Sequence, residues 1–164
     1  MSDTTAVRYI DAITRRYERL GYAPYRWFAA DAAPALQALS KPMAQSRLGV
    51  LATSGTYVAG QVAYHYKDDT SLRAIARDTP AEALRFAHIT ENYLLDSRRD
   101  PNCTFPIDAL RAQEASGNIG ELADDLLSCM GGIYSQRRVR EELIPAVSER
   151  FKAQQVDAVM LIPM

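Results

Sequence analysis

The sequence lacks an excess of charge of one sign and a long hydrophobic run. Lys and Arg number 19 against 20 Asp and Glu, a formal net charge of −1. This balance gives no electrostatic reason to expect nucleic acid or a membrane as the main partner. No apolar run approaches the roughly 20 residues of a membrane span, and the polar first 20 residues are not typical of a signal peptide.

Cysteine and nucleotide-binding motifs are also scarce. The two cysteines, Cys103 and Cys129, suggest neither a disulfide framework nor a CxxC motif, so we expect a reduced, cytoplasmic protein. No GxGxxG or Walker motif is present, and no nucleotide is predicted. The 164 residues fit one domain. We divide this domain into an N-terminal helix and aromatic arm, residues 1–45, and a core, residues 46–164.

The apolar periodicity predicts alternating helices and strands. Helices are expected over 5–20, from Thr79 to His88, over 105–117 and over 135–155, the last kinked by Pro145. Buried strands are expected over 47–53, 122–128 and 156–162, the last apolar on both faces, as in parallel strands covered by helices. The aromatic residues after the first helix are Tyr22, Tyr25, Trp27 and Phe28. We interpret them as packing or a subunit contact, with a stacking platform as the alternative.

This order predicts an α/β fold with a three-layer, mainly parallel sheet of the Rossmann-like, doubly wound kind, truncated after its last strand. The carboxyl ends of the strands should then meet at one edge, where ligands bind in such sheets. Residues 53–55, 128–132 and 163–164 are expected there.

Several stretches together resemble one family. They are "LRAIARDTP", "DSRRDPNCTFPIDALRAQEASGNIGEL", "MGGIYS" and "RFKAQQVDAVMLIP". They are similar to the selenoprotein B family of the D-proline, glycine, sarcosine and betaine reductases, above all to the smaller subunit of D-proline reductase. The resemblance covers most of residues 45–163. In that family the strand resembling "VDAVMLIP" is followed by a Sec-x-x-Cys or Cys-x-x-Cys motif, whose selenolate attacks the substrate carbon.

The sequence stops at Met164, immediately before the position of that motif, so the resemblance is to a short form without it. Two explanations remain open: the reading frame was ended at a selenocysteine codon, or the chain is a naturally short, diverged member that has lost the reductase chemistry.

Candidate catalytic residues are His88, Glu91 and Cys129. His88 and Glu91 are spaced i, i+3 and would share a helix face. With His65 and Asp96 they form a possible divalent-metal site. The simpler alternative is a solvated loop or a structurally hydrogen-bonded histidine. Cys129 follows a strand and precedes two glycines, a position that suits a nucleophile, although a structural role is favoured. We interpret Cys103 as a buried structural thiol.

Candidate substrate-binding residues share a predicted place at strand ends or in the family-like blocks. They are Arg77, Ser54, Gly55, Gly131, Gly132 and Tyr93. Arg77 would bind a carboxylate in bidentate fashion, and a structural Arg–Asp pair is an equally good interpretation. The glycines would let backbone amides approach an anion.

The expected function is that of a diverged reductase-family enzyme acting on an amino acid or related small amine. Two alternatives remain: a non-catalytic subunit or binding module of a larger complex, and a metal-dependent tailoring enzyme using residues 65–96. A last apolar strand without a following helix leaves a sheet face uncovered, so we expect a homo-oligomer or a partner subunit.

Overall fold

The computed structural model describes the chain except residues 1–7, 25–27 and 36. It forms two units, residues 1–36 and 37–164. In the first unit, helix α1, Tyr9–Arg19, confirms the predicted helix. All of its apolar side chains are solvent-exposed. The predicted aromatic cluster includes Tyr25 and Trp27, which lie outside the described residues.

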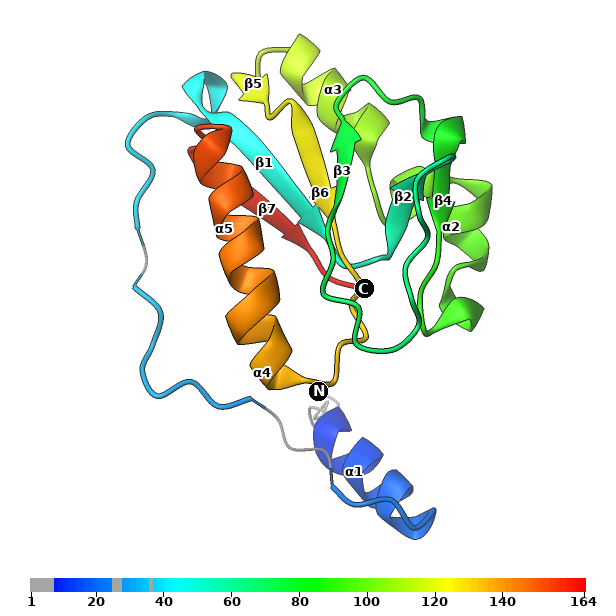
Figure 1. Cartoon of the computed structure of the whole chain (residues 1–164). Coiled ribbons are helices and arrows are strands. Elements are labelled where there is room, and N and C mark those ends of the chain that lie inside the picture. The colour runs from blue at the N-terminus through cyan, green and yellow to red at the C-terminus, as the bar shows by residue number, and fades with distance from the viewer. Residues whose placement is uncertain (1–7, 25–27, 36) are drawn as a thin grey trace, which may run out of the picture. The chain divides into compact units, whose positions relative to one another are not determined.

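The second unit is built on a mixed sheet centred on β1, Arg47–Ala52 (Figure 1). Strand β1 pairs in parallel with β5, β6 and β7, and β3 pairs antiparallel with β6. The bounds are Arg73–Ala76 for β3, Glu121–Leu122 for β5, Asp125–Ser128 for β6 and Ala158–Ile162 for β7. The α/β class is thereby confirmed, and the sheet is mixed because β3 runs against its neighbour.

The predicted C-terminal helix is one winding segment with a distortion before Pro145. It comprises α4, Gln136–Arg138, the π-helical turn η5, Val139–Leu143, and α5, Ile144–Ala153. Proline lacks a backbone N–H, so the turn that precedes it loses a regular helical hydrogen bond and widens. Helix α5 lies across the sheet over β1 and β7 (Figure 1). A Cβ on Gly49 would lie 2.7 Å from the Phe151 ring, so this helix packs directly on the strand backbone.

The hydrophobic core lies against the alternate residues of β1. Leu48, Val50 and Ala52 join a buried cluster whose other members come from β3, β5, β6, residue 84 and the region of α3, Ile107–Ala115. These members are Ile75, Leu84, Phe105, Ile107, Leu110, Ile119, Leu122 and Leu126. Helix α3 confirms the helix predicted over 105–117.

The helix predicted from Thr79 to His88 is wrong. After a 3-10 turn, η2, Ala81–Ala83, the chain forms β4, Leu84–Phe86, which pairs antiparallel with β2, Thr56–Val58. Leu84 and Phe86 are buried while Arg85 is exposed, which is the two-residue period of a strand. Burial of this alternating pair outweighs the helix-start signals of the residues before it.

Short helical turns follow β4. They are η3, Glu91–Tyr93, α2, Leu95–Arg99, and η4, Pro101–Cys103; a further 3-10 turn, η1, Met43–Gln45, precedes β1. His88 lies before η3, outside any helix. The predicted sharing of a helix face by His88 and Glu91 is therefore wrong.

Strand β7 is also not buried as predicted. It pairs with β1 on one side, and the described residues place no strand on its other side. Val159, Met160 and Leu161 are exposed, Leu161 by 67%. A strand apolar on both faces suits a central position, but tertiary topology puts this one at the sheet's edge.

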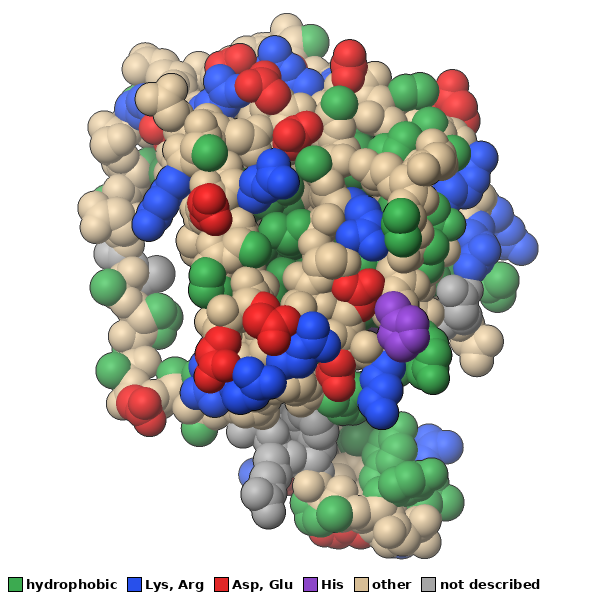
Figure 2. Space-filling model, viewed as in Figure 1, with side chains coloured by type: hydrophobic (Ala, Val, Ile, Leu, Met, Phe, Trp, Pro, Cys, Tyr) green, Lys and Arg blue, Asp and Glu red, His purple; other side chains and the backbone are tan. Residues whose placement is uncertain are grey.

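Charged side chains of both signs lie on the face drawn in Figure 2. Figure 2 shows Lys and Arg side chains interspersed with Asp and Glu, including a mixed cluster over α4 and η5. There the i, i+4 pairs Arg137–Glu141 and Arg138–Glu142 form ion pairs. Among the described residues, no helix has the length and apolar character needed to cross a membrane.

Candidate functional site

The carboxyl ends of β1, β6 and β7 meet, as predicted. The backbone N–H of Thr53 donates to the carbonyl of Ile162 at 3.0 Å, and the N–H of Met164 donates to Thr53 Oγ1 at 2.9 Å. Ser54 forms an isolated antiparallel bridge with Met130. We call this meeting point the carboxyl edge, defined by residues 53–55, 128–132 and 162–164.

Gly55 holds a second segment against the carboxyl edge. Its N–H donates to the carbonyl of Cys129, and its own carbonyl accepts from the N–H of Ala87, both at 3.0 Å. Its φ is +64°, and a Cβ here would overlap the carbonyl oxygen of Ala87. Only glycine adopts this conformation at such close approach without strain. The residues after β4, beginning with Ala87 and His88, are thereby fixed beside the ends of β1 and β6.

Gly131 and Gly132, which follow β6, also allow neighbouring segments to pack closely. A Cβ on Gly131 would lie 2.7 Å from the Thr53 carbonyl oxygen and 3.0 Å from His88 Nε2. A Cβ on Gly132 would overlap Cγ2 of Ile89. The structure thus brings the predicted residues Ser54, Gly55, Gly131 and Gly132 together and adds His88 to them.

His88 is held by the residue two positions along the chain. The imidazole is 6% exposed. Its Nδ1 lies 2.6 Å from the Thr90 hydroxyl oxygen, and the N–H of Thr90 donates to Nδ1 at 3.1 Å. Nε2 lies on the Gly131 side of the ring. His88 therefore has a fixed orientation, with one nitrogen directed toward the carboxyl edge.

Hydroxyl groups form a buried network below the same edge. Ser54 and Thr56 share a hydrogen bond between their hydroxyl groups at 2.7 Å, and the N–H of Thr56 donates to Ser128 Oγ at 2.9 Å. The Tyr64 hydroxyl donates a hydrogen bond to the carbonyl of Ser128 at 2.6 Å. Burial raises the pKa of Tyr64 well above its usual value of 10.0, so the phenol stays protonated.

Sequence reasoning missed Tyr64 and Thr90. Each acts through a contact with the backbone or a side chain that only the folded chain brings near, and their local sequence carries no motif. Arg73 packs over the Tyr64 ring, 4.3 Å from its centroid, and supports the tyrosine from the side of β3.

The two thiols occupy opposite environments. Cys129 is 1% exposed, and burial raises the pKa of its thiol to about 12. A thiolate is the nucleophilic form of cysteine, so this environment disfavours nucleophilic chemistry at neutral pH. Cys103, expected to be buried, is exposed at the end of η4. The turn structure of residues 101–103 keeps it outside the core.

Two of the residues proposed as metal ligands lie at the surface. His65 and Asp96 are both exposed; the N–H of His65 bonds to Asp69, and Asp96 pairs with Arg99 at 3.5 Å. Tyr93 is exposed as well, and the side chain of Glu91 lies outside the described part. Among the side chains that the structure describes, no group of three His, Cys, Asp or Glu could hold a metal ion.

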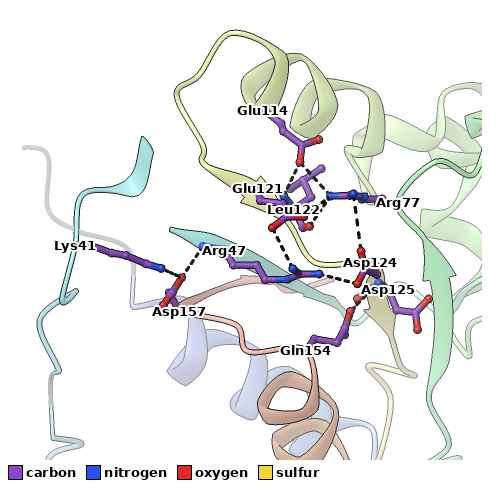
Figure 3. A network of polar contacts seen from close by, with 10 residues as sticks. All are labelled: Lys41, Arg47, Arg77, Glu114, Glu121, Leu122, Asp124, Asp125, Gln154 and Asp157. Carbon is purple, nitrogen blue, oxygen red and sulfur yellow. Dashed lines mark hydrogen bonds and ion pairs between the residues drawn. The ribbon is translucent and has the colours of Figure 1, made fainter. Parts of the chain in front are cut away.

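Arg77 lies at the opposite end of the parallel strands, which we call the amino edge (Figure 3). Its guanidinium Nη1 lies 3.2 Å from Glu121 Oε1 and 3.4 Å from Glu114 Oε1, and it donates to the carbonyl of Leu122 at 3.0 Å. An open pocket of about 420 Å³ adjoins it. Because Arg77 is already paired with carboxylates, the structural interpretation of this residue is the better one.

Arg47 and Asp157 extend the network of the amino edge (Figure 3). Arg47 pairs with Asp124 at 2.7 Å and with Glu121 at 3.0 Å. Asp157 accepts from the N–H of Arg47 and pairs with Lys41, both at 2.7 Å. The hydrogen bond from the Arg47 N–H, followed by the contact with Lys41, holds the pKa of Asp157 below its usual value. The amino edge is thus a set of paired charges that joins the starts of β1, β5 and β7.

A mixed α/β protein with buried polar groups at the strand ends is a broad class. Sequence comparison narrows the class. The family model for glycine/sarcosine/betaine reductase selenoprotein B matches residues 85–163, which include His88, Cys129 and Gly131. The chain is 27% identical to D-proline reductase subunit gamma of Acetoanaerobium sticklandii over 128 residues, covering 78% of this chain and 52% of that protein. No solved structure matches.

Both matches are similarities to the selenoprotein B and D-proline reductase family. They confirm the resemblance seen in the sequence. The chain spans about half the length of the curated relative that it matches.

Proposed function

We propose that the chain is a reductase-related subunit that binds an amino acid or small amine at its carboxyl edge and buries strand β7 against another protein chain. The observation that carries the proposal is the exposed, apolar edge strand β7, whose end is hydrogen-bonded to the carboxyl edge through Met164. The other chain is a second copy or a partner subunit.

The physical cost of leaving β7 open supports this assembly. Apolar surface gains roughly 25 cal/mol per Å² on burial, and an edge strand offers backbone N–H and C=O groups to a neighbour. Side chains alternate along a strand. Val159 and Leu161 therefore lie on the face of the sheet that α5 covers, and Met160 lies on the opposite face. A partner that contacts β7 therefore gains apolar burial on both faces.

The state of Cys129 favours a binding and positioning role over thiolate chemistry by this chain's own residues. Its burial and raised pKa keep the thiol protonated. The similar protein from Acetoanaerobium sticklandii is named as a subunit, which agrees with a division of labour between chains. We also propose that this subunit works in the cytoplasm, where free thiols such as Cys103 remain reduced.

We further propose that the sheet is covered in the three-layer, doubly wound manner. Gly49 packs on Phe151 of α5, while its neighbours Leu48 and Val50 join the core with α3. Alternate residues of a strand face opposite sides, so this arrangement supports one helix layer on each face.

Light scattering with a matched pair of variants tests the assembly. At micromolar concentration the wild-type chain should have at least twice the mass of one chain, and Leu161→Ser should lower it toward a monomer. The control is Val62→Ser, because Val62 is 79% exposed in a loop outside the sheet and should not affect assembly. A monomeric wild-type chain, or equal behaviour of the two variants, would contradict the proposal.

A further inference from the structure

We propose that Thr90 is a positioning residue that fixes the neutral His88 side chain in the tautomer with its proton on Nε2. His88 then presents an N–H donor, and not a basic lone pair, to the carboxyl edge. The functional meaning of this donor rests on the proposed binding site at that edge, whereas the tautomer itself follows from contacts within the chain.

The contacts at Nδ1 determine where the proton lies. A backbone N–H can only donate, so the 3.1 Å hydrogen bond from Thr90 requires a lone pair on Nδ1. In a neutral imidazole the other nitrogen then carries the proton. The Thr90 hydroxyl, 2.6 Å from Nδ1, can donate to the same lone pair and strengthen this preference.

The position of Nε2 gives the donor its direction. The Cβ position of Gly131, which holds no side chain, is 3.0 Å from Nε2 and 3.1 Å from Thr53 Oγ1. The N–H of His88 therefore lies where β1 and β6 end, behind the Gly131 backbone. With His88 only 6% exposed, a hydrogen bond made there is little weakened by water.

Because Nε2 is a hydrogen-bond donor, it determines the kind of group that His88 can bind. An N–H donor suits an oxygen acceptor and does not suit an ammonium group. A general base would need the opposite tautomer. We therefore infer a hydrogen-bond donor at the carboxyl edge, with Thr90 acting through His88.

Nitrogen NMR of the full, ¹⁵N-labelled chain tests the tautomer directly. The sequence has only two histidines, so both side chains are assignable with one substitution, His65→Gln. At a pH where the imidazoles are neutral, His88 should show a protonated Nε2 and an unprotonated Nδ1. A wild-type spectrum with the proton on Nδ1 would overturn the inference, whatever the variants do.

Two substitutions at Thr90 test the positioning role. Thr90→Val removes the hydroxyl and keeps the N–H, and we expect a detectable population of the other tautomer. Thr90→Ser retains the hydroxyl and should restore the wild-type His88 signals, while the His65 signals stay unchanged throughout. Unaltered His88 signals in Thr90→Val, or no recovery in Thr90→Ser, would contradict the role. Light scattering tests the assembly separately, so the two proposals can fail independently.

Discussion

At the amino edge of the sheet, charged side chains of both signs pair with one another near the surface, whereas at the carboxyl edge uncharged polar groups lie buried between backbone segments. Arg47 and Arg77 each contact at least two carboxylates. His88, Thr56 and Ser128 are instead fixed by hydroxyl groups and backbone amides. The charged end is therefore held together by paired side chains, and the binding site that we propose lies at the other end.

Glycine accounts for much of this difference. At the carboxyl edge, Gly55, Gly131 and Gly132 allow backbone to approach backbone and imidazole. At the amino edge, long side chains span the spaces between strands (Figure 3). Substitutions at the two edges should consequently differ in the free energy that they cost and in how far they disturb the structure.

The largest effect is expected for Gly55→Ala. The added methyl would overlap the Ala87 carbonyl and occupy a backbone conformation with positive φ, so we expect a loss of about 2–4 kcal/mol in unfolding free energy. Denaturant unfolding measures it. The control is Gly117→Ala, also at positive φ but with open space around it, for which about 1 kcal/mol is expected. Equal losses would show that the close approach at Gly55 contributes nothing.

A smaller loss is expected for Arg47→Met at the amino edge. The variant keeps most of the aliphatic stem but removes the pairs with Glu121 and Asp124, and we expect a loss of about 1–2 kcal/mol that shrinks in high salt. Arg137→Met, at an exposed i, i+4 pair, should lose about 0.5 kcal/mol or less. The His88 NMR signals should not change in either variant. A change in the His88 NMR signals in Arg47→Met would contradict the independence of the two edges.

The smallest effect is expected for Asp157→Asn, and it depends on pH. The folded-state pKa of Asp157 is lowered from its ordinary 3.8, so the charged form contributes stability above that pH, and the contribution is lost as the pH falls through the lowered pKa. Thermal midpoints should therefore differ slightly at neutral pH and converge in acid. Asparagine still accepts from the Arg47 N–H, which keeps the difference small. A difference in thermal midpoint that widens on acidification would contradict this explanation.

The sequence predicted the central parts of the fold well. The buried run of β1 and the two glycines after Ser128 carry local signals, and parallel topology then places their ends together. For the same reason the sequence predicts Ser54, Gly55 and Gly131 at the carboxyl edge. Their presence at one edge follows from strand direction alone.

The failures have physical causes as well. Thr79, Pro80 and Glu82 are good helix-start residues, but the burial of Leu84 and Phe86 on one face made the next residues a strand. The sequence of β7 is apolar on both faces, and nothing in it shows that the strand lies at an edge. The residue type of Arg77 suits a carboxylate ligand, but its sequence does not indicate the end of the sheet at which it lies.

Tyr64 and Thr90 illustrate a further limit. Tyr64 reaches a carbonyl 64 residues away, and Thr90 matters because of the ring nitrogen that it contacts. Neither contact follows from local periodicity or from a motif, so only the folded chain identifies these residues as part of the candidate site.

Light scattering of the wild-type chain over a dilution series at micromolar concentration tests the central claim most directly. If β7 is an interface, the mass should be at least twice that of one chain and should fall toward one chain in Leu161→Ser but not in Val62→Ser. A wild-type chain that stays monomeric at every concentration, with β7 open to solvent, would contradict the account.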